Sequence, residues 1–154
     1  MCALKFDGPC FGKAAICEPI LRSLPAWFGV EQAVVQYIAE IDNLPTFLAC
    51  EAGAVIGFLS IKQHYPCAAE ILVMGIRQEA HRRGIGRTLV HQAQEWLKSQ
   101  GVEYLQVKTL GPSRPDDNYA KTRAFYLAIG FQPLEELPQI WDEDNPCLLM
   151  IQRL

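Results

Sequence analysis

The sequence predicts one α/β or α+β domain, residues 1–154, built on a mixed β-sheet. Three observations predict this fold class: apolar residues at helical spacing come first, strand-like segments in a meander follow, and a strand–loop–helix–strand unit comes next. Half of the 154 residues are hydrophobic and a fifth are charged, so the chain can bury a sizeable core. It contains no internal repeat, low-complexity tract or linker that would mark a second domain.

The first half of the chain is predicted to hold two helices and then three strands. The helices follow from apolar residues three and four positions apart, and the strands from short apolar runs bounded by turn residues. These segments are, in order, residues 13–24, 30–41, 46–51, 54–63 and 69–76. Pro25 ends the first helix, and Ala52 and Gly53 form a hairpin turn between the first two strands.

The second half is predicted to continue as helix, strand, helix and strand. The corresponding segments are residues 88–97, 102–110, 118–129 and 146–154. Gly101 and Gly130 are well placed to end the two helices, because glycine adopts the left-handed conformation common just after a helix. The segment GPSRPDD, residues 111–117, is predicted to be a loop.

Charge and cysteine content exclude several classes of protein. The net charge of −3 and the pI near 5.6 argue against nucleic acid as the partner, because a phosphate backbone requires a broad basic face. The six cysteines form no CxxC pair and do not cluster with the three histidines, so no zinc site is expected. No charged leader precedes an apolar core, and no apolar run has membrane-spanning length. We therefore expect a cytoplasmic protein with reduced thiols and no membrane partner.

The segment HRRGIGR, residues 81–87, lies between a predicted strand and a predicted helix. A helix start exposes backbone N–H groups that have no partner inside the helix, and glycines let a ligand approach them closely, so phosphate is the expected ligand. The segment lacks the Gly-Lys-Ser/Thr ending of a Walker loop, and Leu89 stands where a dinucleotide fingerprint needs glycine or alanine. An ordinary tight turn with solvated arginines is the alternative interpretation.

Residues 81–86, His-Arg-Arg-Gly-Ile-Gly, resemble the acetyl-CoA loop of the GNAT superfamily of N-acetyltransferases. The family pattern is Gln or Arg, two residues, Gly, one residue, and Gly or Ala, from which His81 departs. The resemblance extends from Thr46 to the C-terminus, whereas residues 1–12 fit the family's first strand poorly. It implies a mixed, mostly antiparallel central sheet flanked by helices, in which the fourth strand splays from the fifth and admits the pantetheine arm of acetyl-CoA.

The resemblance assigns acetyl-CoA binding to two adjacent segments. The backbone at the end of the third predicted strand would hold the pantetheine arm, and the amides and helix dipole after it would hold the pyrophosphate. The expected cofactor-binding residues are Met74, Gly75, Ile76, Arg82, Arg83, Gly84, Ile85, Gly86, Arg87 and Thr88. Acetyl-CoA is then a co-substrate, and no metal is needed.

Tyr126 lies four residues before Gly130 and Phe131, which is the position of the family's proton donor. The resemblance therefore implies that its phenol protonates the departing thiolate. A phenol has a reference pKa near 10, so it can donate a proton without being ionised at neutral pH. The alternative is a core tyrosine, because Tyr126 shares a predicted helix face with Phe125 and Ile129.

Glu70 opens an otherwise apolar predicted strand. An amine with a pKa near 10 is almost entirely protonated at pH 7, so attack on a thioester requires a group that removes a proton. The run Ala69-Glu70-Ile71 resembles the general base segment of the histone acetyltransferase branch, which implies this role for Glu70. A solvated strand end and a water chain without a dedicated carboxylate are the alternatives, and His64 and Tyr65 are weaker candidates for the same task.

The family's acceptor pocket is bordered by the turn between the first two helices and by the loop before the last strand. Residues 25–29 and 140–145 occupy these places here. Aromatic rings could hold an apolar or cationic stem, and the carboxylates would attract a positive ligand. The expected acceptor-binding residues are Trp27, Phe28, Trp141 and Asp142. A solvated acidic turn beside surface aromatics is the alternative.

The sequence thus predicts an N-acetyltransferase that moves the acetyl group of acetyl-CoA to a primary amine by direct attack in a ternary complex. A small cationic metabolite is the expected acceptor, and acetylation of a protein or peptide amine is an alternative. Two other functions would use the same loop. One is a non-catalytic CoA-binding regulatory module of the same fold, and the other is an unrelated nucleotide-binding protein. The identity of the amine and the formation of a homodimer are left open.

Overall fold

The structure is a computed structural model and describes residues 3–154. Strands and helices alternate along the chain much as their apolar spacing predicts. In chain order they are β1 (Leu4–Cys10), α1 (Ala14–Arg22), α2 (Glu31–Ile41), β2 (Thr46–Glu51), β3 (Ala54–Tyr65), β4 (Ala68–Ile76), the 3₁₀ turn η1 (Gln78–Ala80), α3 (Ile85–Ser99), β5 (Tyr104–Leu110), α4 (Asp117–Ala128), β6 (Gln132–Asp142) and β7 (Asn145–Arg153).

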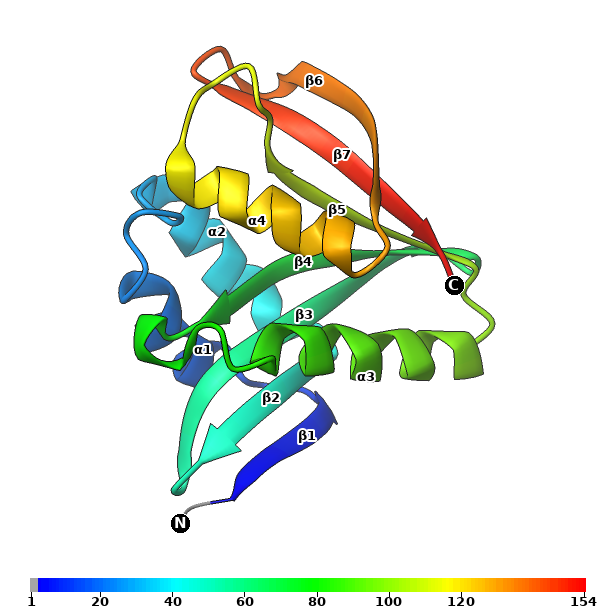
Figure 1. Ribbon diagram of the computed structural model, residues 1–154. Coiled ribbons are helices and arrows are strands. Elements are labelled where there is room, and N and C mark those ends of the chain that lie inside the picture. The colour runs from blue at the N-terminus through cyan, green and yellow to red at the C-terminus, as the bar shows by residue number, and fades with distance from the viewer. Residues whose placement is uncertain (1–2) are drawn as a thin grey trace.

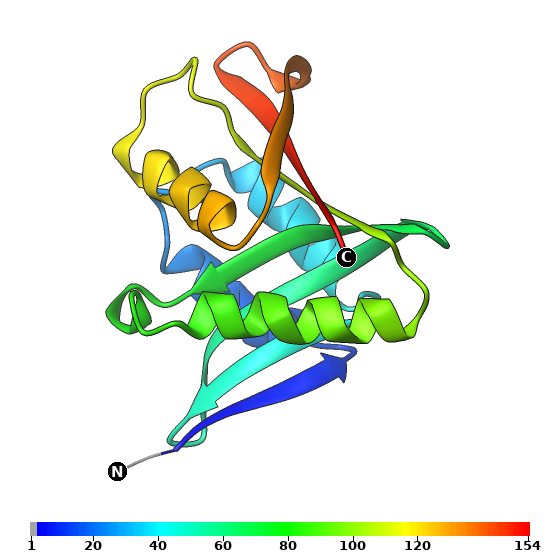
Figure 2. The same cartoon turned by 45° about the vertical axis from the view of Figure 1, so that its right-hand side comes forward.

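The strands form one seven-stranded sheet in the order β1-β2-β3-β4-β5-β7-β6, in which only β4 and β5 are parallel. Figure 1 shows α3 and α4 in front of this sheet and α1 and α2 behind it, and the turned view of Figure 2 agrees. Each face covers its own apolar core, one under α3 and α4 and one under α1 and α2. The predicted mixed, mostly antiparallel sheet flanked by helices is confirmed.

The pairing between β4 and β5 ends early. It joins residues 68–71 to residues 104–107, and neither strand continues the ladder beyond that point. In Figure 1 the two strands lie side by side near one end and diverge toward the N-terminal end of α4. Ile71 pairs with Ile61 and Val73 pairs with Ser60, so Leu72 is an extra residue in β4 at the point of divergence. Such a bulge bends a strand, which explains why β4 leaves its neighbour here.

Two strands were missing from the sequence prediction, and both lie at the edges of the sheet. β1 pairs only with β2, and β6 pairs only with β7. β6 carries Pro133 and Pro138 and is exposed along most of its length, so it lacks the alternating apolar pattern of a half-buried strand. The other elements lie within a few residues of their predicted bounds. None of the helices in residues 3–154 combines the length and apolar character that crossing a membrane needs.

Candidate active site

The loop before α3 presents uncapped backbone amides. Gly84 is the N-cap residue, with a left-handed φ of 77°, and in the described chain no side chain caps this helix. The first intrahelical bond runs from Thr88 N to Gly84 O at 3.1 Å, which leaves the earlier amides of the turn without helical acceptors. α4 differs, because the Asp116 carboxylate accepts from Tyr119 N at 2.9 Å. The start of α3 is therefore suited to an external anion.

Different features of the structure favour glycine at positions 84 and 86 of the loop. A side chain at Gly84 would meet no protein atom within 4 Å, so within the chain it is the positive φ that favours glycine. A Cβ at Gly86 would lie 3.1 Å from Ile76 Cδ1 and 3.2 Å from Phe125 Cζ. Gly86 is buried and lets α3 approach the end of β4 and α4 closely. Packing is therefore one physical reason for glycine at position 86, and the role of Gly86 in ligand binding stays a prediction.

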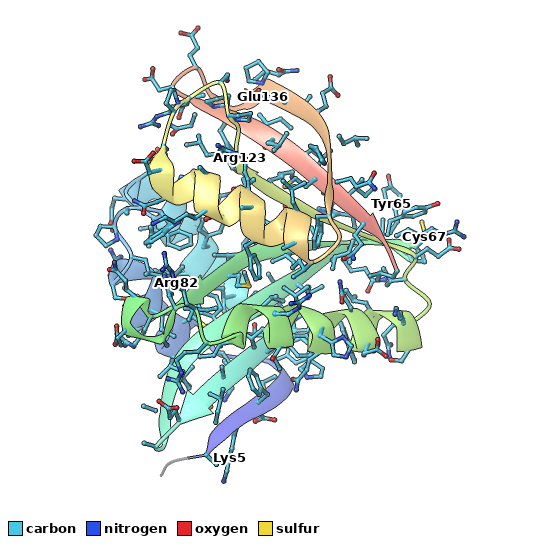
Figure 3. The ribbon with its side chains drawn as sticks, viewed as in Figure 1. Lys5, Tyr65, Cys67, Arg82, Arg123 and Glu136 are labelled. Carbon is cyan, nitrogen blue, oxygen red and sulfur yellow. The ribbon has the colours of Figure 1, made fainter. Side chains whose placement is uncertain are left out.

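The three arginines of the loop lie in different surroundings. Arg83 forms a two-pronged ion pair with Glu51 of β2. Arg82 has a left-handed φ of 62° and is exposed on the loop ahead of α3, where Figure 3 labels it. Arg87 and Thr88 line a groove of about 630 Å³ between α3 and the end of α4. Arg82 and Arg87 are thus accessible to a phosphate, whereas Arg83 is held by a carboxylate.

His81 joins three parts of the site. Its Nε2 lies 2.7 Å from Ile76 O, and because a carbonyl oxygen only accepts, Nε2–H is the donor. The His81 ring meets Trp27 edge-on, with ring centroids 5.7 Å apart. Trp27 donates Nε1–H to Thr122 Oγ1 at 3.1 Å, and its carbonyl accepts from the Tyr119 hydroxyl at 2.6 Å. The turn between α1 and α2 therefore reaches α4 at the open end of the β4–β5 split.

The predicted pantetheine segment lies on the open side of β4. Residues 74–76 pair with β3 along one edge of β4. Along the opposite edge of β4, no described residue of β5 pairs with them. Met74 and Ile76 pack against the core under α3, and a Cβ at Gly75 would lie 3.2 Å from Phe58 Cε1. No neighbouring strand in residues 3–154 uses this edge, so it can accept an extended ligand as an added strand, although Ile76 O already accepts from His81.

Tyr126 is placed by α4 over the sheet, with 5% of its surface exposed. Its ring meets Phe125 and Phe131 edge-on, with ring centroids 5.2 and 5.5 Å apart. Burial, with a smaller contribution from Tyr119, raises the pKa of the Tyr126 phenol well above its usual value. The phenol therefore keeps its proton throughout the neutral range, and it forms no hydrogen bond with residues 3–154 that would occupy it.

Glu70 is only 3% exposed and lies among polar side chains from two strands. Its Oε1 is 2.7 Å from His64 Nε2, 3.4 Å from Gln106 Nε2 and 3.5 Å from Lys108 Nζ. All three contacts go to the same oxygen, so Oε2 is the oxygen left to take a proton. Tyr65, by contrast, is 71% exposed at the β3–β4 turn, and Figure 3 shows it away from the split.

Glu70 and Tyr126 approach the split from opposite faces of the sheet. Lys62 pairs with Glu70 across β3 and β4, and its Nζ binds Glu40 of α2 at 2.8 Å, so Glu70 faces α2. Burial and then the nearby Glu70 charge raise the pKa of Tyr37 on α2, which agrees with this placement. Tyr126 belongs to the core under α3 and α4.

The four predicted acceptor residues fall into two separate groups. Phe28 meets Tyr37 of α2 edge-on, and Trp27 contacts α4 as described above. Trp141 is 40% exposed, and Asp142 Oδ1 accepts from the backbone of Asp144 at 2.9 Å within the β6–β7 turn. No hydrogen bond, ion pair or ring contact of residues 3–154 joins the two groups. In Figures 1 and 2 the N-terminal part of α4 and the loop before it lie between them.

Several contacts of the site could not be read from the sequence. Gln106 and Lys108 reach Glu70 only because β5 lies beside β4, and Tyr119 and Thr122 reach Trp27 only because α4 crosses the open end of the split. The one available signal was Lys108, a charged residue inside an apolar predicted strand. No group of three or more potential metal-ligating side chains occurs among the described residues.

The chain matches a family model described as the acetyltransferase (GNAT) family over residues 17–131, which is more than half of its length. It is 31% identical over 104 residues to an uncharacterized N-acetyltransferase of Chlorobaculum tepidum, a match that covers 66% of this chain and 60% of that protein. The chain spans between 26% and 60% of the length of the curated relatives that it matches.

Solved structures share the fold. A GNAT-family acetyltransferase of Desulfovibrio desulfuricans superposes with a TM-score of 0.84 at 15% identity, covering 98% of this chain and 99% of that one. The PaiA N-acetyltransferase of Thermoplasma acidophilum, solved in complex with coenzyme A, superposes with a TM-score of 0.75 at 16% identity and covers 99% of both chains. At these identities the likeness concerns the fold.

Proposed function

Since the chain belongs to the GNAT family of acetyltransferases, we propose that it transfers the acetyl group of acetyl-CoA to a primary amine, within one acetyltransferase domain formed by residues 1–154. The observation that carries this proposal is the split between β4 and β5, which leaves an unpaired strand edge next to the uncapped start of α3. A ligand with an extended amide-bearing arm and a pyrophosphate fits these two features together.

The proposed binding mode assigns each part of acetyl-CoA to a part of the site. The pyrophosphate lies on the amides after Gly84, with Arg82 and Arg87 nearby, and the pantetheine arm lies along residues 74–76. The groove between α3 and α4 lies beyond the loop and can hold the nucleotide end. A coenzyme A complex is known for the structurally similar PaiA N-acetyltransferase. The proposal includes no metal.

The proposed chemistry is direct attack in a ternary complex. The amine nitrogen attacks the thioester carbonyl carbon, a C–N bond forms, and the C–S bond breaks. Glu70 Oε2 takes the proton that the amine loses, and the Tyr126 phenol gives a proton to the departing thiolate. The Tyr126 phenol carries its proton at neutral pH, as a donor must, and burial makes it a weaker acid than an exposed phenol because it raises the pKa. A backbone N–H of β4 can polarise the carbonyl oxygen.

We propose a small cationic amine as the acceptor. The buried Glu70 beside the split supports this choice, because a carboxylate attracts a positive ligand. The acidic residues 142–144 lie on the separate β6–β7 turn and would act through the field of their charges. Trp27 and Phe28 lie on the α1–α2 turn, which reaches the open end of the split. A protein or peptide amine is the alternative. A cytoplasmic location stays a prediction.

The test measures CoA binding and acetyl transfer separately. Calorimetry gives the affinity for CoA and for ATP, and release of the CoA thiol from acetyl-CoA is followed with panels of polyamines, small amines, amino acids and peptides. We expect CoA binding and thiol release that depends on a small amine, with the acetylated product seen by mass spectrometry. CoA binding without amine-dependent release would indicate a non-catalytic module. ATP binding in place of CoA would indicate a nucleotide-binding protein.

A further inference from the structure

Thr109 of β5 carries a buried hydroxyl that has no hydrogen-bond partner. The residue is 4% exposed, and its Oγ1 is the one buried side-chain nitrogen or oxygen in residues 3–154 for which no partner is found. Buried polar atoms in proteins are normally satisfied, and an exception calls for an explanation such as a ligand. The proposed chemistry of Glu70 and Tyr126 does not use Thr109.

Thr109 lies in the separated part of the strand pair. The last pair between β4 and β5 joins Ile71 to Val107, so Thr109 is two residues beyond it. Side chains two residues apart on a strand share a face, and Leu105 and Val107 both belong to the core under α3 and α4. Leu148, directly opposite Thr109 on β7, belongs to the same core. The hydroxyl therefore faces the α4 side of the split.

The helix α4 brings Tyr126 to the same face of the sheet. Arg123 donates to Leu110 O, the carbonyl next to Thr109, at 2.7 Å, so α4 lies over this end of β5, as Figure 3 shows for Arg123. Tyr126 comes three residues later on α4, nearly one turn along. The chain thus presents two hydroxyls on the α4 side of the split, and neither is used by another residue of the described chain.

We propose that the Thr109 hydroxyl binds the pantetheine arm of acyl-CoA, an assignment that rests on the proposed function. The arm carries two amides and ends in sulfur, and a hydroxyl can donate to or accept from these groups. An arm that lies along the free edge of β4 passes the level of Thr109 on β5. Thr109 holds the arm before and after transfer, whereas Tyr126 acts on the sulfur as the C–S bond breaks.

The test compares Thr109→Val, which removes the hydroxyl at nearly constant shape, with Thr109→Ser, which keeps it. Calorimetry gives the affinity for CoA and for adenosine 3′,5′-bisphosphate, which lacks the pantetheine arm. We expect Thr109→Val to bind CoA roughly 5- to 15-fold more weakly and the bisphosphate equally well. The KM for acetyl-CoA should rise by a similar factor, and Thr109→Ser should stay close to the wild type.

The ligand-free protein supplies a second readout. Because the hydroxyl has no partner without ligand, Thr109→Val should raise the melting temperature by about 2–4 °C while it weakens CoA binding. Wild-type CoA affinity in Thr109→Val would overturn the assignment, and so would an equal loss for CoA and the bisphosphate. If the valine variant fails to fold, Thr109→Ala replaces it. Failure of the wild type to bind CoA would instead overturn the proposed function itself.

Discussion

Replacing Glu70 by glutamine removes one negative charge from the α2 side of the split and keeps the size of the side chain. The carboxylate is 3% exposed, and its Oε1 contacts His64, Gln106 and Lys108 at 2.7, 3.4 and 3.5 Å. A glutamine amide oxygen can still accept from these three donors, but the amide cannot take a proton from an amine. Glu70→Gln therefore separates the chemical role of the carboxylate from its structural role.

The expected loss of rate is larger than the expected loss of stability. A positioned general base contributes about 10²- to 10⁴-fold to a rate, which corresponds to about 3 to 5 kcal/mol in the barrier. The Lys108 side chain is 29% exposed and glutamine can still accept from it, so loss of the negative charge beside it should cost about 1–3 kcal/mol. Domains of this size have stabilities of about 5–15 kcal/mol, so the variant should remain folded.

The assay follows CoA thiol release at saturating acetyl-CoA with the best amine, from about pH 6 to about pH 10. The loss should be greatest at low pH, where an amine with a pKa near 10 is most fully protonated. Glu40→Gln is the matched control, because Glu40 pairs with Lys62 at 2.8 Å on the same face but lies on α2. Wild-type turnover and an unaltered pH profile in Glu70→Gln would refute the reasoning and point to a water chain as the base.

Three further changes test the site and the fold. Tyr126→Phe keeps the ring contacts and should lower turnover by roughly ten- to ten-thousand-fold with unchanged CoA affinity, whereas equal turnover would make Tyr126 a core residue only. Changing Asp142, Glu143 and Asp144 together to Asn or Gln should raise the KM for the best amine and leave that for acetyl-CoA unchanged; a constant amine KM would make the turn ordinary surface. Burial raises the pKa of the Cys17 thiol from 9.0 to about 12. Because the folded-state pKa lies above the unfolded one, its contribution to stability is complete below about pH 9 and is lost as the pH rises toward about 12, by about 1.4 kcal/mol per pH unit. Denaturant unfolding at several pH values should show this decline, and Cys17→Ala should make it less steep, since Cys147 and Tyr119 also have raised pKa values and remain in the variant. An equal decline in the variant would contradict the assignment.

The interior elements could be predicted from the sequence because each buries one face. In α3, the residues Leu89, Val90, Ala93 and Leu97 are buried, at the spacing of a helix that packs on a sheet. β1 and β6 could not be predicted in this way, since an edge strand has one neighbour and fewer buried positions. β1 is placed in the sheet by its pairing with β2, which lies far from it in the sequence. β6 is placed by its pairing with β7, which follows it after a turn.

The candidate site likewise contains residues that a local motif predicts and residues whose surroundings depend on strand pairing. The loop before α3 and Tyr126 belong to short local motifs, so the sequence shows them directly. The surroundings of Glu70 and the isolation of the Thr109 hydroxyl depend on which strands are neighbours and where their pairing stops. Gly86 illustrates the limit of a motif, because the residue type was expected but its close contacts with Ile76 and Phe125 could not be read from the sequence.

The division of polar groups between the two faces of the sheet has a consequence for the proposed reaction. Glu70 faces α2, and its neighbour His64 has a side chain that is 34% exposed, so water can reach the edge of this polar group on the α2 face. Tyr126 lies on the α4 face within an apolar cluster, where the sulfur would depart. The amine should therefore approach from the α2 face and the thiolate should form on the α4 face. Because the two proton transfers occupy opposite faces, the carboxylate and the phenol do not contact each other, and each can act on its own atom of the reacting group.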